Sequence, residues 1–474
     1  MDRVSLEVAT MSMGKREEKQ QSMWHSTTEL PRSPGHKFYE KLNELLAGAK
    51  FDHQVEALCE RFYAAERATG RRSIPPGIYF RMLLIGYFEG IESERGIAWR
   101  CTDSLSLRAF LGLLPNEGVP DHSSLSRIRS RLDLAVYDEV FKLVLSIVEA
   151  QGLLRGKVAG IDSTYLRADA SMKTIVRKDT GLHYQEFLKK LCEEQGIEKP
   201  TAEDCRRVDR KRKGKRTSNK DWQSKTDGDA RIARLKDGRT RLGYKAEHVV
   251  DMDSGVVVAA EIHAADQGDT ATIEASLETA RKNIEAAKTG GDNDDDPPAP
   301  TASTKTISVV ADKGYHKAEL LKTLKGQGYR TYVAVPKSNG THRWKDKGGF
   351  FTARAYRANR DRVATEKGKG LLRRRGEMIE RTFAHTCETG AHRRVRLRGQ
   401  ENVAKRYRIQ AAALNLGIVM RHLFGQGTPR QAAEARKRLF ALFALLHRTW
   451  ALLLAELQLV LWGPRRETAW TTLV

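Results

Sequence analysis

The sequence predicts an α/β protein whose sheet lies between an all-α N-terminal region and a helical C-terminal segment. Between residues 37 and 151, apolar residues recur at helical spacing. Between residues 157 and 312, short apolar runs bounded by turn residues are typical of strands. A long apolar stretch near the end has helical character. The chain of 474 residues has room for about two to four domains if each takes ~100–200 residues.

The first 36 residues are predicted to be flexible. Polar and charged residues dominate them, and Pro31, Pro34 and Gly35 interrupt their end. They lack the apolar central region of a signal peptide, which favours a cytoplasmic protein.

The region 37–151 is predicted to be a helical, DNA-binding domain. Near its end, Asp121 and Ser123 are candidate N-caps for a helix that continues to residue 132. One face of this helix carries Arg127, Arg129 and Arg131, which would suit contacts with DNA phosphates. An ordinary solvated basic face explains these arginines equally well.

The next region has strands and a helix in the order of an RNase H-like core. One strand is predicted at 158–166, a hairpin at 242–251 and 256–262, a helix at 269–287 and a further strand at 306–311. In that topology the first and last of these strands are neighbours. Asp162 and Asp312 are therefore expected to meet.

Two segments interrupt this predicted α/β domain, residues 157–425. Residues 171–239 are highly charged and include the run Arg210-Lys-Arg-Lys-Gly-Lys-Arg216. Such a run fits a DNA-contacting arm or a solvated loop. Residues 288–305 are acidic and rich in proline, which predicts a linker.

Composition indicates the partner. The chain has 83 Lys and Arg against 60 Asp and Glu, a formal charge of +23, and such a surplus attracts a polyanion such as nucleic acid. The five cysteines show no metal-ligand spacing, so free thiols in a reducing cytoplasm are expected.

The C-terminal segment 430–474 is predicted to be helical. Its most apolar part, residues 439–462, is interrupted by His447, Arg448 and Glu456, which disfavours a membrane span. A core helix or a partner-binding helix fits better, and packing within the chain is the expected use.

Three carboxylates suggest phosphodiester chemistry. Asp162 and Asp312 accompany buried strands, and Glu380 lies in a helical stretch. Buried carboxylates are costly unless they bind a cation, and two divalent ions about 3.5–4 Å apart are a recurring device for phosphoryl transfer. Glu377 shares a helix face with Glu380 and is the alternative candidate for the third carboxylate. Ile379, which would anchor the helix to the core, favours Glu380.

Six motifs follow one another along the chain. They are Pro120-Asp-His-Ser-Ser-Leu-Ser-Arg127, Asp162-Ser-Thr-Tyr-Leu-Arg-Ala-Asp-Ala-Ser171, Leu242-Gly-Tyr-Lys-Ala-Glu-His248, Ala311-Asp-Lys-Gly-Tyr315, Glu380-Arg-Thr-Phe383 and Arg396-Leu-Arg-Gly399. The first resembles the end of the helical N-terminal domain of bacterial insertion-sequence DDE transposases. The other five resemble the catalytic-domain signatures of that family, and the likeness covers about residues 37–421.

The resemblance implies an RNase H-like transposase that binds terminal inverted repeats, cuts them and joins the ends to target DNA. Asp162, Asp312 and Glu380 would hold two Mg²⁺ ions, for which Mn²⁺ would substitute. Because two DNA ends must meet, the protein is expected to form a homodimer on DNA. It is also expected to be associated with the nucleoid. Candidates for DNA contact within the motifs are Lys245, His248, Lys313, Arg381, Arg396 and Arg398.

Some positions depart from the family pattern. Cys387 stands where a lysine or arginine is common, and Arg373 and Gly376 replace a tyrosine and an arginine. Lys245 and His248 also fit the solvated face of a strand. Two other functions therefore stay open: a nuclease with the same core that cuts without joining, and an inactive relic that only binds DNA.

Overall fold

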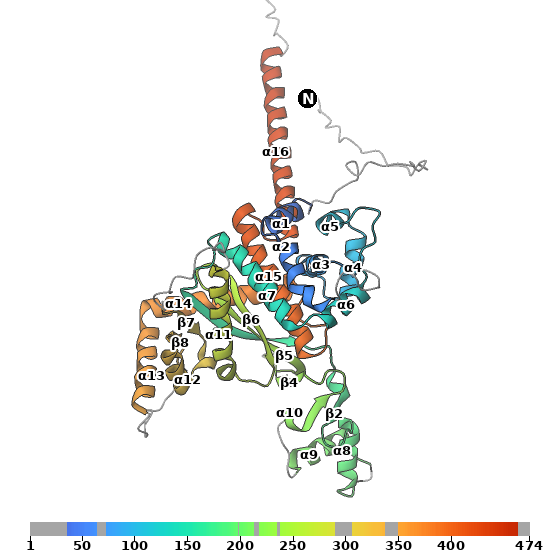
Figure 1. Ribbon diagram of the computed structural model, residues 1–474, viewed down its shortest axis with the longest axis vertical. Helices are drawn as coiled ribbons and strands as arrows, with labels where there is room; N and C mark the ends of the chain where they lie inside the picture. Colours follow the sequence, from blue (N-terminus) through green and yellow to red (C-terminus); the bar gives the residue numbers. More distant parts are fainter. Residues whose placement is uncertain are drawn as a thin grey trace, which may run out of the picture.

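Figure 1 shows a computed structural model of mixed α/β architecture. It describes residues 36–63, 73–197, 199–212, 218–234, 238–289, 306–336 and 349–462. The segment 1–36 predicted to be flexible lies outside the described residues except for His36, as does most of the predicted linker 288–305.

All regular elements in the described residues of the N-terminal part are helices. Its helices are α1 (His36–Gly48), α2 (Phe51–Cys59), the 3-10 helix η1 (Glu60–Phe62), α3 (Pro76–Phe88), α4 (Glu94–Thr102), α5 (Leu105–Phe110), α6 (His122–Arg131) and α7 (Leu134–Ala150). Of the two candidate caps for α6, Asp121 is the one used: its carboxylate accepts the Ser124 backbone N–H at 2.8 Å. Leu125 and Ile128 of α6 are buried.

The central sheet contains every strand that the sequence predicts. β1 (Val158–Arg167) pairs antiparallel with β5 (Thr240–Asp251), which pairs antiparallel with β6 (Val257–Ala264). On its other side β1 pairs parallel with β7 (Ser308–Ala311), and β7 pairs parallel with β8 (Arg330–Val333). The short β4 (Arg231–Arg234) pairs with β5. The expected pairing of the first and last predicted strands is confirmed.

Helices cover both faces of this sheet. Lys245 and Glu247 of β5 contact Thr272 and Ser276 of α11 (Asp269–Thr289) on one face. One residue further on, His248 points to the other face and contacts α14 (Glu366–Ala384) and α15 (Gln400–Phe424). Because successive side chains of a strand alternate between faces, β5 is buried on both sides.

Helix α15 is buried along most of its length and joins the sheet to the N-terminal helices. It packs against β6, α7 and α3, and a continuous set of buried apolar residues runs from α1 to the sheet. Ion pairs cross the same boundary. The buried Arg408 of α15 contacts Asp138 of α7 at 2.5 Å and Glu261 of β6 at 2.7 Å.

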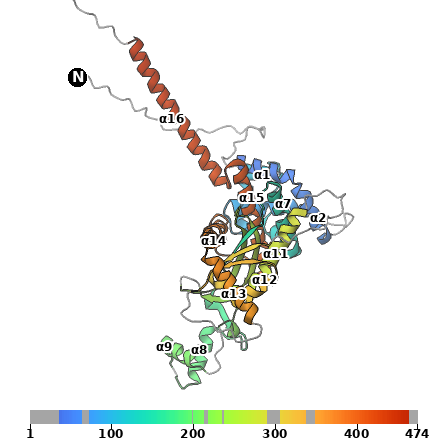
Figure 2. The same cartoon turned by 90° about the vertical axis from the view of Figure 1, so that its left-hand side faces the viewer.

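The charged insertion contains a folded unit, so a purely solvated loop is excluded for its described part. It comprises η2 (Met172–Thr174), β2 (Ile175–Arg177), α8 (Tyr184–Glu193), α9 (Ala202–Lys211), α10 (Ser218–Asp221) and β3 (Trp222–Ser224), and β2 pairs with β3. Trp222 packs edge-on against Tyr184 and Phe187, with ring centroids 5.0 and 5.4 Å away. In Figures 1 and 2 this unit lies at one end of the molecule.

Helix α16 (Pro429–Trp462) projects from the opposite end of the molecule (Figures 1 and 2). Its large apolar side chains from Leu439 to Leu457 are exposed. The expectation that this segment packs within the chain is therefore wrong for these residues. None of the helices in the described ranges is both long and apolar enough to cross a membrane.

The remaining helices flank the parallel edge of the sheet. They are η3 (Lys313–Tyr315), α12 (Ala318–Gly326) and α13 (Gly349–Ala364). The π-helical turn η4 (His385–Thr389) continues α14 and packs against α15 and α3. Helix α14 packs against β1, β5, β7 and β8. It therefore crosses the strands that carry Asp162 and Asp312.

Candidate active site

Asp162 lies in the middle of β1, on the sheet face that α14 covers. Its side chain is 25% exposed, and its carboxylate contacts the guanidinium of Arg375 at 3.0 Å. Arg375 also donates a hydrogen bond to the Ile161 carbonyl at 3.1 Å. The guanidinium of α14 thus holds the Asp162 carboxylate from one side.

Asp312 is the first residue after β7, the parallel neighbour of β1. Its side chain caps η3 by accepting the Gly314 backbone N–H at 2.7 Å. Tyr315 closes the same turn and is buried, and its pKa is raised by burial and then by the negative charges of nearby carboxylates, Asp162 among them. Asp162 therefore lies in β1 and Asp312 directly follows the adjacent strand β7, the neighbour expected from the sequence.

Glu380 is exposed in α14, on the helix that packs against Asp162. Ile379 points into the core, and Gly160 of β1 faces it so closely that a Cβ there would come within 3.1 Å of the Ile379 side chain. Glu380 lies about 100° around the helix from Ile379, and Glu377 about 200°, on the side away from the sheet. Glu377 instead pairs with Arg381 at 2.8 Å.

The described part of the chain holds no group of three or more acidic, histidine or cysteine side chains positioned to bind a metal ion. The structure thus brings Asp162 and Asp312 to neighbouring strands but does not gather Glu380 with them. Asp162 and Asp312 offer carboxylate oxygens, the ligands that Mg²⁺ prefers.

A third aspartate, Asp269, stands beside Asp312 and was not a candidate in the sequence. A Cβ on Gly314 would meet an Asp269 carboxylate oxygen at 2.7 Å and an Asp312 oxygen at 3.0 Å, so the two carboxylates flank this glycine. Asp269 also accepts a hydrogen bond from Ser163 at 2.9 Å and pairs with Lys245 at 2.9 Å. The only sequence signal was its place at the start of a predicted helix, where aspartate is common as a cap.

A buried carboxylate, Glu247, holds the turn that carries Asp312. Tyr315 donates to Glu247 at 2.8 Å, and Thr272 of α11 donates to the same carboxylate at 2.9 Å. Burial alone would raise the pKa of Glu247, but interactions with His263, Ser276, Lys245 and Tyr315 outweigh it and lower the pKa. Glu247 therefore stays charged and fixes Tyr315 behind the site.

Two predicted DNA contacts need correction. Lys245 is 1% exposed and His248 is fully buried, so neither presents a surface to DNA or to solvent. His248 instead bonds Thr382 at 3.0 Å and Tyr407 at 2.7 Å. The alternating pattern suggested a solvated face, but helices cover both faces of β5.

The three arginines of α6 differ in their surroundings. Arg129 is largely buried and pairs with Glu94, so it serves the packing of α6 against α4. Arg131 is exposed and stacks over the Tyr63 ring at 4.8 Å. Arg127 is exposed. Arg127 and Arg131 remain available at the surface, whereas Arg129 does not.

The other four basic candidates are exposed. Lys313 follows Asp312 directly, and Arg381 pairs with Glu377. Arg396 pairs with Glu92 of the N-terminal part at 2.7 Å, and Arg398 pairs with Asp169 at 3.3 Å. These exposed pairs add little stability, so each arginine can exchange its carboxylate for a phosphate at small cost.

The three residues that depart from the family pattern lie in α14 and η4. Cys387 lies in η4, half-buried, and burial raises its pKa. Gly376 and the exposed Arg373 lie in α14 on either side of Arg374 and Arg375. The cation that contacts Asp162 is Arg375, the neighbour of the substituted position.

Comparison with known protein families gives two matches. Residues 28–131 match the family model described as Transposase domain (DUF772), and residues 216–416 match the model described as Transposase DDE domain. Asp312 and Glu380 lie within the second match, and Asp162 lies between the two. No match was found among curated proteins or among solved structures. The two domain matches, in the order that the six motifs predict, identify the chain as a member of the DDE transposases of insertion sequences.

Proposed function

We propose that this transposase cuts the terminal inverted repeats of its element and joins them to target DNA through Asp162, Asp312 and Glu380. The observation that carries the proposal is the pairing of β1 with β7, which sets Asp162 beside the Asp312 turn. The order β6-β5-β1-β7-β8, antiparallel on one side of β1 and parallel on the other, fits an RNase H-like core.

The reaction requires divalent cations, and Mg²⁺ suits these carboxylates, with Mn²⁺ as a substitute. Bound there, two such ions would activate the attacking oxygen and stabilise the leaving 3′ oxygen of the DNA strand. Asp162 and Asp312 would hold the cations. Glu380 projects from α14, which covers the same sheet face as Asp162, and would complete the set. Arg375 must leave the Asp162 carboxylate when a cation takes its place.

The DNA would lie across exposed basic residues from both parts of the chain, within a cytoplasmic, nucleoid-associated complex. Arg127 and Arg131 on α6 and Lys313 beside Asp312 are surface cations of the kind that contact phosphates. Arg381, Arg396 and Arg398 belong to the same proposal. The helical region 37–151 would then position the repeat for the catalytic region 157–425.

The second copy that end pairing requires would bind through α16. Apolar residues follow one stripe of this helix with alternating spacings of four and three residues, the pattern of a coiled-coil seam. All of them are 53–65% exposed: Leu439, Phe443, Leu446, Trp450, Leu453 and Leu457. A contiguous exposed apolar stripe of this kind marks a surface that a partner covers.

The products separate this function from its two alternatives. The purified protein is incubated with Mg²⁺ and DNA that carries the repeats flanking its gene, beside Asp162→Asn and Asp312→Asn variants. A transposase gives nicked and joined DNA, and both aspartate variants lose both products. Nicks without joined DNA would favour the nuclease. Specific binding without any cut would favour the inactive relic.

A further inference from the structure

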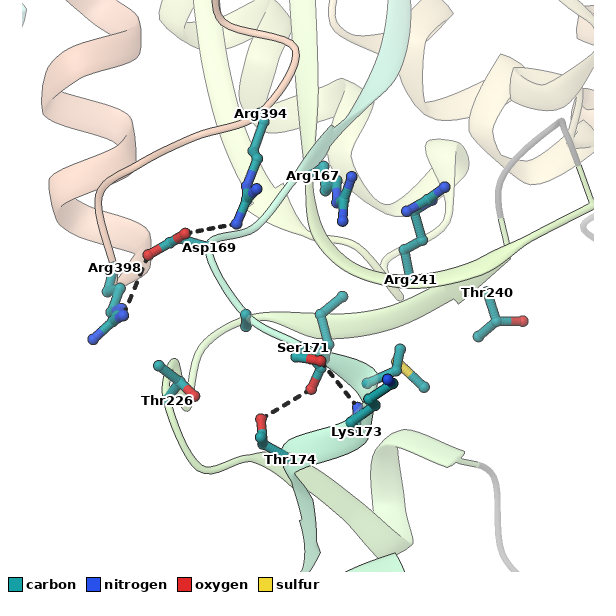
Figure 3. A pocket seen from close by; sticks show the side chains of 13 residues that line it. Arg167, Asp169, Ser171, Lys173, Thr174, Thr226, Thr240, Arg241, Arg394 and Arg398 are labelled. Atoms are coloured by element: carbon teal, nitrogen blue, oxygen red, sulfur yellow. Dashed lines mark hydrogen bonds and ion pairs between the residues drawn. The ribbon is translucent and has the colours of Figure 1, made fainter. Parts of the chain in front are cut away.

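A cavity of about 600 Å³ lies where β1 leaves the sheet and enters the insertion (Figure 3). Five cationic side chains and one carboxylate line it. The cations are Arg167 from β1, Lys173 from η2, Arg241 from β5, and Arg394 and Arg398 from the segment before α15; the carboxylate is Asp169. Four separate segments thus bring positive charge to one opening.

Strand register explains why Arg167 and Arg241 gather there. Arg167 is paired with Gly243 of β5, and Arg241 lies two residues from Gly243 on the same strand. Diagonal neighbours of an antiparallel pair share a face of the sheet. Arg167 is five residues beyond Asp162, about 17 Å along the strand, and on the opposite face. The cavity is therefore separate from the carboxylates.

The cations are close enough to repel one another. Burial, and then the positive charges of Arg241 and Arg394, lower the pKa of Arg167. Asp169 accepts hydrogen bonds from Arg394 at 2.9 Å and Arg398 at 3.3 Å, so it orients these two side chains. Among the described residues, no carboxylate pairs with Arg167, Lys173 or Arg241.

Polar donors complete the lining. The Nε atom of Arg394 is buried and has no hydrogen-bond partner among the described residues. Hydroxyl groups of Ser171, Thr174, Thr226 and Thr240 stand around the same opening (Figure 3). Guanidinium, ammonium and hydroxyl groups are the donors that proteins present to phosphate oxygens. On an ordinary solvated basic surface, cationic side chains from four segments would not be expected to converge on one cavity.

We propose that this cavity, the Arg167–Arg241 pocket, binds the phosphodiester backbone of the DNA on which the transposase acts. This inference rests on the proposed function, which identifies the bound strand as DNA of the element. The pocket lies at the base of the folded insertion, so it would hold DNA at a point distant from the cut phosphate. The DNA-binding surface would then include the junction between the sheet and the insertion.

The test measures the affinity for repeat-containing duplex DNA by fluorescence anisotropy between 50 and 300 mM salt, without divalent cations. Each phosphate contact contributes about 0.9 to the slope of log affinity against log salt. Arg167→Ala/Arg241→Ala is expected to lower that slope by about 2. Arg167→Lys/Arg241→Lys keeps the charges and is expected to keep most of the slope.

A matched control removes the same charge elsewhere. Arg436 and Arg438 are exposed at the start of α16, at the other end of the molecule. Arg436→Ala/Arg438→Ala is expected to leave the slope within about 0.5 of wild type, on the scale of 0.9 per phosphate contact. Equal slopes for the pocket variant and this control would overturn the pocket proposal, while wild-type cleavage would still support the function.

If wild-type protein has no affinity for the repeat-containing DNA, both proposals are overturned. This result is measured on the wild type and needs no variant, so it differs from failure of the pocket proposal alone. A free nucleotide would use the same cations, so ATP replaces DNA in a parallel titration. Binding of ATP that depends on Arg167 and Arg241, with DNA slopes unchanged, would assign the pocket to a nucleotide and contradict the proposed ligand.

Discussion

A single buried histidine joins three elements of the fold. His248 of β5 bonds Thr382 of α14 and Tyr407 of α15, and it stacks on the Phe383 ring at a centroid distance of 4.4 Å. Burial lowers its pKa from 6.5 to about 3. The neutral imidazole therefore belongs to the native state, and protonation opposes folding.

We expect the stability of the protein to fall as pH decreases below 6.5. The unfolded chain binds a proton at His248 near pH 6.5 and the native chain near pH 3, so the stabilisation is complete above 6.5 and is lost toward 3. The slope is ~1.4 kcal/mol per pH unit for this group. Thermal unfolding at pH 7 and pH 5 should show a smaller loss in His248→Gln than in wild type. The exposed His53→Gln serves as the control, and equal losses in all three proteins would contradict the assignment.

At the same scale, Arg375 competes with any cation for Asp162. The ion pair is largely shielded from solvent, at 12% and 25% exposure. A cation that binds Asp162 must break this ion pair, which makes its binding less favourable by roughly 1 kcal/mol. That free energy corresponds to about a fivefold weaker affinity. We expect Arg375→Ala to bind Mn²⁺ about fivefold more tightly in equilibrium titrations followed by electron paramagnetic resonance.

The neighbouring Arg374→Ala is the control, because Arg374 is 48% exposed and lies near Asp253 instead. It should bind Mn²⁺ like wild type, and Asp162→Ala should bind it weakly. Unchanged Mn²⁺ affinity in Arg375→Ala would show that the ion pair does not limit the site.

At the scale of elements, the sequence predicts the strands well and their surroundings poorly. Apolar runs bounded by turn residues mark β1, β5, β6 and β7 because each must bury side chains. The pattern of β5 misleads at Lys245. This lysine is buried because it donates to Thr272 of α11 and pairs with Glu247, to which Thr272 also donates. β4 and β8 have four residues each, too few for a reliable pattern.

The site could be predicted in part for a similar reason. Asp162 and Asp312 follow from strand order, because topology alone makes β1 and β7 neighbours. Asp269 and Arg375 could not be found, since their roles depend on how α11 and α14 dock on the sheet. The folded insertion was also missed, because its helices α8 and α9 bury few residues under a highly charged sequence.

Helix α16 gives a prediction about assembly. Aspartates within the proposed seam, as in Leu446→Asp/Leu453→Asp, are expected to convert a dimer to a monomer in light scattering at micromolar concentration. Leu445→Asp/Leu452→Asp introduces the same charge one residue away from the seam and should stay dimeric. Wild-type protein that is monomeric both free and on DNA would contradict the proposed interface.

At the scale of the whole molecule, the N-terminal helices and the sheet share one core through α15. Cutting the chain near residue 152 would separate α7 from α15 and α11 and expose the faces that α7 buries against them. We therefore expect one cooperative unfolding transition for the full chain in calorimetry, and fragments 36–151 and 152–462 that aggregate when made separately. Two resolved transitions, or a stable 152–462 fragment, would show independent domains instead.

The measurement that tests the catalytic assignment most directly compares Glu380→Ala with Glu377→Ala on repeat-containing DNA in Mg²⁺. Both glutamates are exposed on α14 three residues apart, so the variants are matched in helix, charge and exposure. The account predicts that Glu380→Ala loses cleavage and joining by at least about 100-fold, of the order seen when a transition-state contact is removed, while Glu377→Ala retains both. Cleavage that survives in Glu380→Ala, or fails in Glu377→Ala alone, would contradict the assignment of Glu380 as the third carboxylate.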